Sequence, residues 1–251
     1  MTIRLRTLLL AALLVPGVTS ADEPFTATSE AAGVGLDLSV LTRTLAITGG
    51  NGAQDVEIDG DLAGIRAYWQ GQNGLRLEGR ALGGNVDVES GDFDDTEAAR
   101  LLEGRVTYGM DIRNGDRAYA GIAHESLAVD GPGDAGDLRL RSWYVPLGYA
   151  TAGTVRRHWN AVASLEGRFI VAGTDRVEKF DDGDRVRFRR RGGWGIAADV
   201  TFRSRDAPFE IQPYLYWMDF STSRSESVGS ADLRTTDGDG GAVGIRIHLA
   251  Y

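Results

Sequence analysis

The stretch that decides the fold is Val243-Gly244-Ile245-Arg246-Ile247-His248-Leu249-Ala250-Tyr251. Every second side chain in it is apolar, and the side chains between are small or polar. A helix would spread the five apolar side chains around its surface, whereas a β-strand places all of them on one side. The stretch therefore predicts a strand with one apolar face and one polar face.

The same alternation recurs over segments of about ten residues, which is the length of a strand that crosses a membrane. Clear examples are residues 75–81, 102–112, 161–171, 194–202 and 209–217, and less regular ones are residues 117–128 and 138–150. A β-strand is the simplest structure that explains each of them.

Two upstream segments decide the strand count. Residues 34–40 alternate like the later strands, residues 60–70 can form another, and Gln72-Asn73-Gly74 predicts a hairpin turn before Leu75. Including this pair gives about ten strands, an even number that leaves both chain ends on one side of the membrane. The alternative is eight strands, with residues 22–72 as an N-terminal extension or plug.

The connections between these strands alternate between short and long. Short turns are expected near residues 114–115, 151–156 and 204–207. Long polar connections are expected at residues 49–58, 89–100, 129–137, 173–191 and 221–240. Barrels of outer membranes have short periplasmic turns and long outer loops, whereas a soluble β-sandwich has no reason to sort its loops in this way. The fold class predicted is all-β, an antiparallel up-and-down transmembrane β-barrel.

Two other residue types refine this picture. Pro146 and Pro213 fall inside predicted strands, where the missing N–H is expected to produce a bulge or a strand end. Aromatic residues are expected to anchor the barrel at the two membrane surfaces. They are Tyr149, Trp159, Phe202, Phe209 and Tyr251 near the short turns, and Trp143 and Trp194 farther up.

The first residues predict export. Arg4 and Arg6 precede an apolar run from Leu8 to Val15, and small residues follow up to Ala21. This is the order of a secretory signal peptide, and the run is too short for a membrane-spanning helix. We therefore expect a signal peptide over residues 1–21, a periplasmic tail over 22–32 and a barrel over 33–251.

Composition excludes several classes of partner and anchor. The chain has no cysteine, so it forms no disulfide and carries no lipidated cysteine. Its net charge of −9 would repel the phosphates of a nucleic acid. The acidic segments between strands match no spaced calcium-binding loop, and we expect neither a metal nor a cofactor.

The C-terminal residues resemble the last strand of the bacterial outer-membrane β-barrel superfamily. That strand has a glycine, alternating apolar residues and a final aromatic residue, which correspond here to Gly244, Ile245, Ile247, Leu249 and Tyr251. Tyr251 stands where phenylalanine is commoner. The resemblance implies recognition by the barrel-assembly machinery, insertion into the outer membrane and contact with its lipid and lipopolysaccharide. It implies no particular activity, and we expect a monomer.

The sequence Leu-Glu-Gly-Arg occurs three times, at residues 77–80, 102–105 and 165–168. An arginine that faces lipid at the membrane midplane costs about 2–4 kcal/mol, so these charges are expected to face the lumen. The predicted lumen charges are Arg76, Glu78, Arg80, Glu103, Arg105, Asp111, Glu166, Arg168, Asp199, Glu210 and Arg246. They form either an ion-selective constriction or Glu–Arg pairs that fill a narrow barrel, and small barrels favour the second reading.

His124-Glu125-Ser126 raises an enzymatic alternative. It resembles the His-x-Ser arrangement of the lipid A deacylase barrels, which implies a Ser–His–acid set, although Leu127 stands where an asparagine normally follows. The omptin-type proteases also use about ten strands, with paired aspartates and an Asp–His pair at the outer mouth. The other two histidines of the chain, His158 and His248, fall near the predicted periplasmic end, which is opposite to the outer mouth.

The favoured function is therefore a non-enzymatic outer-membrane barrel, porin-like or structural, with a polar and charge-paired lumen. The alternatives are an outer-membrane hydrolase and a surface adhesin or receptor that acts through its outer loops.

Overall fold

The computed structural model describes residues 31–49, 52–90, 93–113, 116–131, 137–156, 158–180, 184–190, 192–223, 226–228 and 231–250. The predicted signal peptide, most of the predicted tail and Tyr251 lie outside this described part. No helix in the described part is long and apolar enough to cross a membrane.

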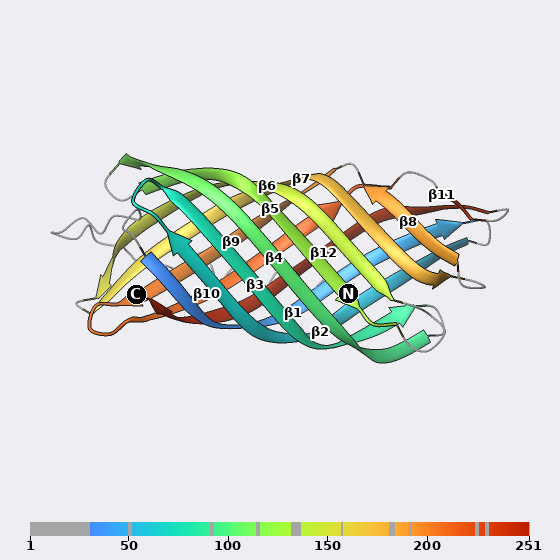
Figure 1. Ribbon diagram of the computed structural model, residues 1–251, viewed down its shortest axis with the longest axis horizontal. Coiled ribbons are helices and arrows are strands. Elements are labelled where there is room, and N and C mark those ends of the chain that lie inside the picture. Colours follow the sequence, from blue (N-terminus) through green and yellow to red (C-terminus); the bar gives the residue numbers. More distant parts are fainter. Residues whose placement is uncertain are drawn as a thin grey trace.

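The described chain is a closed antiparallel barrel with its strands tilted to the long axis (Figure 1). The strands are β1 (Ala31–Gly49), β2 (Gly52–Gln70), β3 (Leu75–Ser90), β4 (Phe93–Arg113), β5 (Asp116–Val129), β6 (Leu138–Arg156), β7 (Trp159–Phe180), β8 (Asp184–Arg190), β9 (Gly193–Ser204), β10 (Phe209–Phe220), β11 (Glu226–Val228) and β12 (Ala231–Ala250).

Ten of these strands form the closed circuit. The order is β1-β2-β3-β4-β5-β6-β7-β9-β10-β12, and β12 returns to pair with β1. The closing pairs include Val34 with Leu249 and Leu38 with Ile245, so the C-terminal stretch seals the barrel. Ten strands and the up-and-down order are confirmed. The eight-strand alternative is wrong, because residues 31–70 form two strands of the wall.

Two short strands prolong the wall beyond this circuit. β8 pairs with the C-terminal part of β7, beyond the part that pairs with β9, and β11 pairs with β12. β8 and β9 follow one line along β7, because Arg190 pairs with Gly173 and Trp194 pairs with Phe169. The line breaks next to Gly193, whose φ of 143° is a conformation that glycine adopts readily.

The strand boundaries were predicted too short at the outer end. β1 and β2 are paired as far as Gly49 and Gly52, and β3 and β4 as far as Ser90 and Phe93. Most of the residues expected in long outer connections therefore lie in strands. At this end the pattern is reversed, because the inward side chains are apolar and the outward ones polar, as in Val86-Asp87-Val88-Glu89. At the other end, the turn predicted at Gln72-Asn73-Gly74 is confirmed.

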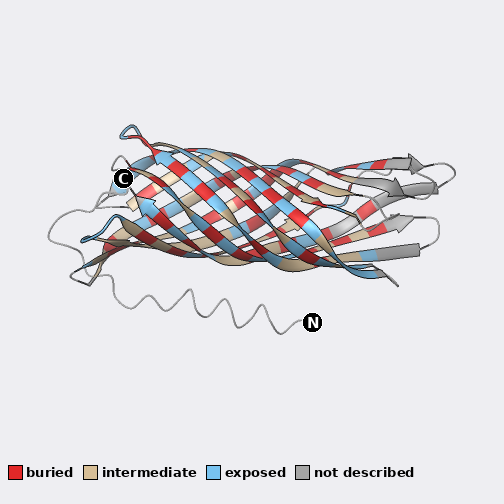
Figure 2. Ribbon diagram, turned by 60° about the horizontal axis from the view of Figure 1, so that its bottom comes forward, coloured by how far each residue is buried: buried red, intermediate tan, exposed pale blue. Residues whose placement is uncertain are grey.

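The apolar face of each strand points outward. Leu36 is 57% exposed while its neighbour Asp37 is fully buried, and the same alternation runs around the barrel (Figure 2). A soluble protein rarely exposes an apolar surface of this extent, so the band is the lipid-facing belt of a membrane barrel. Trp143, Trp194 and Tyr149 are among its exposed aromatic residues, as an anchoring role requires.

The two prolines interrupt the ladder on one side only. Pairing between β5 and β6 skips Pro146, between the pairs made by Leu147 and Tyr144, and pairing between β9 and β10 skips residues 212–213. Each proline still pairs with its other neighbour, Pro146 with β7 and Pro213 with β12. The predicted irregularity is thus a gap in one ladder and not a strand end.

The lipid-facing belt can be tested with one matched pair of variants. Val106 faces outward in the middle of the exposed apolar run of β4, whereas Thr42 faces outward beyond the run of β1. Val106→Arg should lower the free energy of unfolding in lipid vesicles by about 2–4 kcal/mol, and Thr42→Arg by less than about 1 kcal/mol. Guanidinium titrations followed by tryptophan fluorescence would measure both values, and equal losses would contradict the belt.

Candidate functional site in the barrel interior

The inward-facing side chains form two layers inside the barrel. On β1 the inward residues are first Asp37 and Ser39 and then, toward the outer end, Leu41 and Leu45. The other strands follow the same order. A charged layer therefore fills the half near the chain ends, and a mainly apolar layer fills the half near β8 and β11.

The repeated Leu-Glu-Gly-Arg sequence builds the charged layer. The copies on β3 and β4 pair antiparallel, which sets Glu78 opposite Arg105 and Arg80 opposite Glu103. Nε of Arg80 lies 2.5 Å from Oε2 of Glu103. The third copy, on β7, reaches across the lumen, because Glu166 forms an ion pair with Arg105 of β4. The three copies of this four-residue sequence thus form a network of ion pairs that joins the strands β3, β4 and β7.

Arg80 is the centre of this network. Besides Glu103, its guanidinium lies 3.8 Å from the carboxylate of Asp37 and 3.6 Å from that of Glu125. It also donates to the hydroxyl oxygens of Tyr214 and Tyr216, at 3.4 Å and 3.5 Å. Its side chain is almost fully buried. A buried charge of this kind is stable only while its partners stay in place.

Several members of the charged layer carried no signal in the sequence. Arg66 forms an ion pair with Glu78 at 2.6 Å and donates to Gln212 at 2.7 Å. Tyr68 donates to Glu210 at 2.9 Å. Arg66 and Tyr68 lie on a strand with a weak alternation, and their partners Gln212 and Glu210 lie more than 140 residues away in the sequence. Only the closed barrel brings these distant groups together.

The structure places most of the predicted lumen charges inside. The buried ones are Arg80, Glu103, Glu166, Arg168, Glu210 and Arg246, and the partly buried ones are Arg76, Glu78, Arg105 and Asp199. Asp111 is exposed near the turn end of β4. Near that end His248 is also buried, with Nε2 at 3.3 Å from Arg66 and Nδ1 at 3.9 Å from Glu210.

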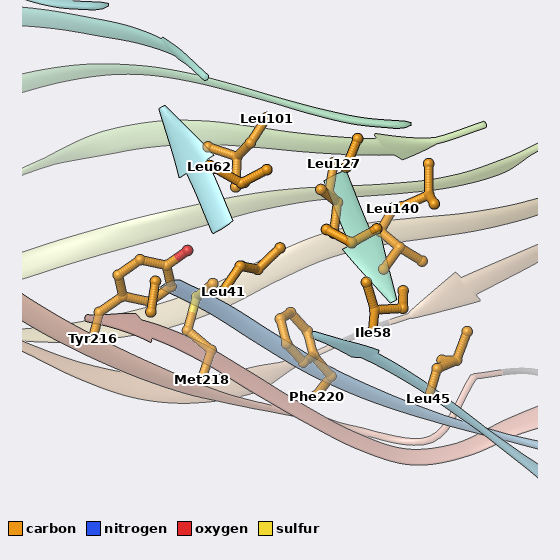
Figure 3. Close-up of a cluster of buried hydrophobic side chains, with 14 of the residues drawn as sticks. Leu41, Leu45, Ile58, Leu62, Leu101, Leu127, Leu140, Tyr216, Met218 and Phe220 are labelled. Carbon is orange, nitrogen blue, oxygen red and sulfur yellow. The ribbon is translucent and has the colours of Figure 1, made fainter. Parts of the chain in front are cut away.

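The outer half of the interior is apolar, so the prediction of a polar lumen is wrong for this half. Its side chains converge from opposite walls (Figure 3). They include Leu41, Leu45, Ile58, Leu62, Leu101, Leu127, Leu140, Met218 and Phe220. Pairs such as Leu101-Leu102 are apolar on both faces and hide this layer, whereas the alternation of Val86-Asp87-Val88-Glu89 was a signal for it that the prediction did not use.

Two buried ion pairs lie within the apolar layer, one between the non-adjacent strands β1 and β5 and one between the adjacent strands β7 and β8. Arg43 lies 3.5 Å from Glu125, and Arg190 pairs with Asp175. The guanidinium of Arg43 also lies over the ring of Phe220, at 3.9 Å from its centroid. Each of these buried arginines is thus neutralised by a buried carboxylate, and apolar side chains surround both pairs.

The proposed hydrolase residues face away from the lumen. Glu125 and Leu127 are buried inside, so His124 and Ser126 lie on the outward face of β5. The ring of His124 packs against Trp143 with centroids 4.7 Å apart.

No carboxylate is paired with either hydrolase candidate. The residues paired with His124 are Gly104 and Trp143. Those paired with Ser126 are Leu102 and Arg141. A Ser–His–acid set needs an acid here, and these positions do not supply one.

In the described part of the chain, the three histidines do not lie where an omptin-type arrangement would need one. His158 lies in a turn, exposed, with Nδ1 at 2.7 Å from Asp206. His248 is buried in the charged layer, and His124 faces outward. None of the three histidines therefore lies in the outer half of the interior. Among the described residues no group of His, Asp and Glu could hold a metal ion.

Comparisons with known proteins bear on the fold alone. No protein-family model and no curated protein matches the sequence. Among solved structures, the outer membrane protease OmpT of Escherichia coli is 8% identical, with 92% of this chain and 99% of that chain covered and a TM-score of 0.54. The toluene transporter TodX of Pseudomonas putida is 8% identical, with 89% and 90% covered, but its TM-score of 0.30 carries no weight. The chain has the fold of the bacterial outer-membrane β-barrels.

The charged layer predicts a large asymmetry between two arginines. Arg80→Leu leaves the buried carboxylates of Asp37, Glu103 and Glu125 without their shared partner and should cost about 3–5 kcal/mol of unfolding free energy. Arg100→Leu removes an exposed pair with Asp130 at 4.0 Å and should cost less than about 1 kcal/mol. Denaturant titration in vesicles measures both.

A double variant isolates the ion pair itself. Arg80→Leu combined with Glu103→Leu should cost less than the sum of the two single changes, because each single change leaves one buried charge behind. Additive losses would mean that the two side chains do not interact.

Proposed function

We propose that this chain, which has the fold of the bacterial outer-membrane β-barrels, is exported and inserted into the outer membrane as a closed structural barrel and not as an open pore. The observation that carries the proposal is the filling of the interior by two successive layers of side chains. The charged layer occupies one half of the described interior and the apolar layer the other, and together they would obstruct a path along the axis.

Bonds across the lumen support the closed state. Arg66 of β2 binds Gln212 of β10, and Arg105 of β4 binds Glu166 of β7. Separating such partners while they remain out of water would leave each buried charge uncompensated, at a cost of several kcal/mol for each ion. The interior therefore holds the walls together and does not serve as a passage.

The apolar layer adds a second barrier to ions. Hydrophobic constrictions exclude water even where a narrow space remains. Met218 and Phe220 of β10 are among its fully buried members, and they belong to the same cluster as Leu41 and Leu101. Ten-stranded barrels are narrow enough for side chains to fill, in contrast to the wide barrels of general porins.

The remaining expectations fit this proposal. Residues 1–21 would direct export, and the outward residues Ile245, Ile247 and Leu249 of β12 would be read by the assembly machinery together with Gly244 and Tyr251. Outward apolar residues are exposed on strands all around the barrel, which suits a monomer surrounded by lipid.

Conductance tests the proposal directly. The refolded protein, inserted into a planar bilayer, should show no discrete current steps at 1 M salt, because both layers block ions. An open porin inserted under the same conditions is the positive control, and resistance to unfolding in gel electrophoresis confirms insertion. Reproducible, salt-dependent steps would refute the closed barrel and support an ion path along the Glu–Arg pairs.

A further inference from the structure

Two aspartates lie directly opposite each other on neighbouring strands near the outer end of the barrel. Asp219 of β10 pairs with Asp239 of β12. Asp219 lies between Met218 and Phe220, which are buried in the interior, and Asp239 is exposed. Alternation along the strands therefore turns both carboxylates outward. Like charges directly opposite each other destabilise a sheet, so a bound cation would stabilise this pair.

The described part of the chain supplies no counter-charge to this pair. The other strand partner of Asp219 is Trp194 of β9, and that of Asp239 is Thr44 of β1. The indole Nε1 of Trp217 donates a hydrogen bond to Oδ2 of Asp239 at 3.3 Å, and no described arginine, lysine or histidine pairs with either carboxylate. An indole N–H is a neutral donor, so both negative charges remain without a cation.

Two tryptophans stand beside the aspartates on the same outward face. Trp194 is half-exposed and pairs with Asp219. The ring of Trp217 meets that of Trp194 edge-on, with centroids 5.3 Å apart and ring planes at 74°. The partner of Trp217 on β12 is Gly241, which has no side chain, so the indole can reach Asp239 on that strand. We call Trp194, Trp217, Asp219 and Asp239 the tryptophan–aspartate site.

The tryptophan–aspartate site lies where the lipid-facing belt ends. The outward residues on the membrane side of it are apolar: Ile196 on β9, Leu215 on β10 and Val243 on β12. The two aspartates are the next polar outward residues of β10 and β12 toward the outer end. A ligand in the site is therefore level with the membrane surface, and an apolar part of it can lie against the belt.

We propose that the tryptophan–aspartate site binds an organic ammonium group at the outer surface of the membrane. A cation over the face of a tryptophan is attracted by the ring, and a nearby carboxylate adds the attraction of an opposite charge. A metal ion fits less well, because two carboxylates supply fewer oxygen ligands than Ca²⁺ takes and no described group of His, Asp and Glu could hold a metal. The inference goes beyond the proposed function, because a closed lumen plays no part in it.

A second acidic pair of the barrel provides a matched control. Asp59 of β2 pairs with Asp87 of β3, and both point outward. Their other strand partners are Thr42 and Thr96, so no tryptophan is paired with them. This pair has the same charge as the tryptophan–aspartate site and lacks its aromatic rings.

Saturation-transfer NMR of the protein in uncharged maltoside micelles can measure the binding of choline. The neutral probe is the carbon analogue of choline, in which a carbon atom replaces the ammonium nitrogen. The test variants are Asp219→Asn with Asp239→Asn, and Trp194→Leu. The matched control is Asp59→Asn with Asp87→Asn, which changes the charge by the same amount. Resistance to unfolding in gel electrophoresis confirms that each variant is folded.

The expected result is that choline binds to the wild type and its carbon analogue does not. The dissociation constant for choline should rise at least about fivefold in both test variants and less than about twofold in the matched control. Equal weakening in the test variants and the control would mean that any acidic pair attracts the cation, and would overturn the proposal. Equal binding of the carbon analogue, or no binding of choline, would overturn it too.

A lipid added to the same micelles identifies the source of the ammonium group. Phosphatidylethanolamine that displaces choline, while phosphatidylglycerol does not, assigns the site to a lipid headgroup. Choline that stays bound in the presence of phosphatidylethanolamine assigns the same site to a soluble ammonium compound. The binding assay does not need a closed lumen, and the conductance test does not need an ammonium ligand, so the two proposals fail independently.

Discussion

The structure depends on one constraint, which is that every backbone N–H and C=O within a membrane must find a partner inside the protein. For a chain of short alternating segments, a closed sheet is the only solution, because an open sheet leaves two edges unpaired in lipid. The pairing of β12 with β1 removes those edges. The outward apolar belt, the narrow interior and the crowding of inward side chains all follow from this closure.

A closed sheet encloses a narrow interior, and in this chain paired charged side chains and apolar side chains fill it. The arginine and glutamate side chains that point inside keep their charges away from lipid, and they must then be paired. Arg80 meets several carboxylates and two tyrosine hydroxyls, so a single guanidinium serves as partner for much of the layer. Toward the outer end the same space is filled by leucine, methionine and phenylalanine, which need no partners.

The sequence predicted the outward half of the structure well and the inward half less well. Outward residues of the belt are consistently apolar, so alternation revealed the strands, the strand count and the facing of Glu78, Arg105 and Glu166. Leu41 and Leu101 were missed as interior residues because the outward residues Val40 and Leu102 beside them are apolar too. Cross-lumen partners such as Arg66 and Gln212 depend on strand tilt and stagger, which spacing along the chain does not encode.

The antiparallel pairing of the two Leu-Glu-Gly-Arg copies has an evolutionary consequence. When the central glycines Gly79 and Gly104 are aligned, glutamate meets arginine on both sides of them, so the sequence is complementary to itself. A strand of this kind that is duplicated beside its parent brings its own neutralising partner and adds no net buried charge. A barrel whose strands carry such a self-complementary sequence can gain strands by duplication without an intermediate that holds unpaired charges. Duplication of this kind gives small barrels a route to larger ones.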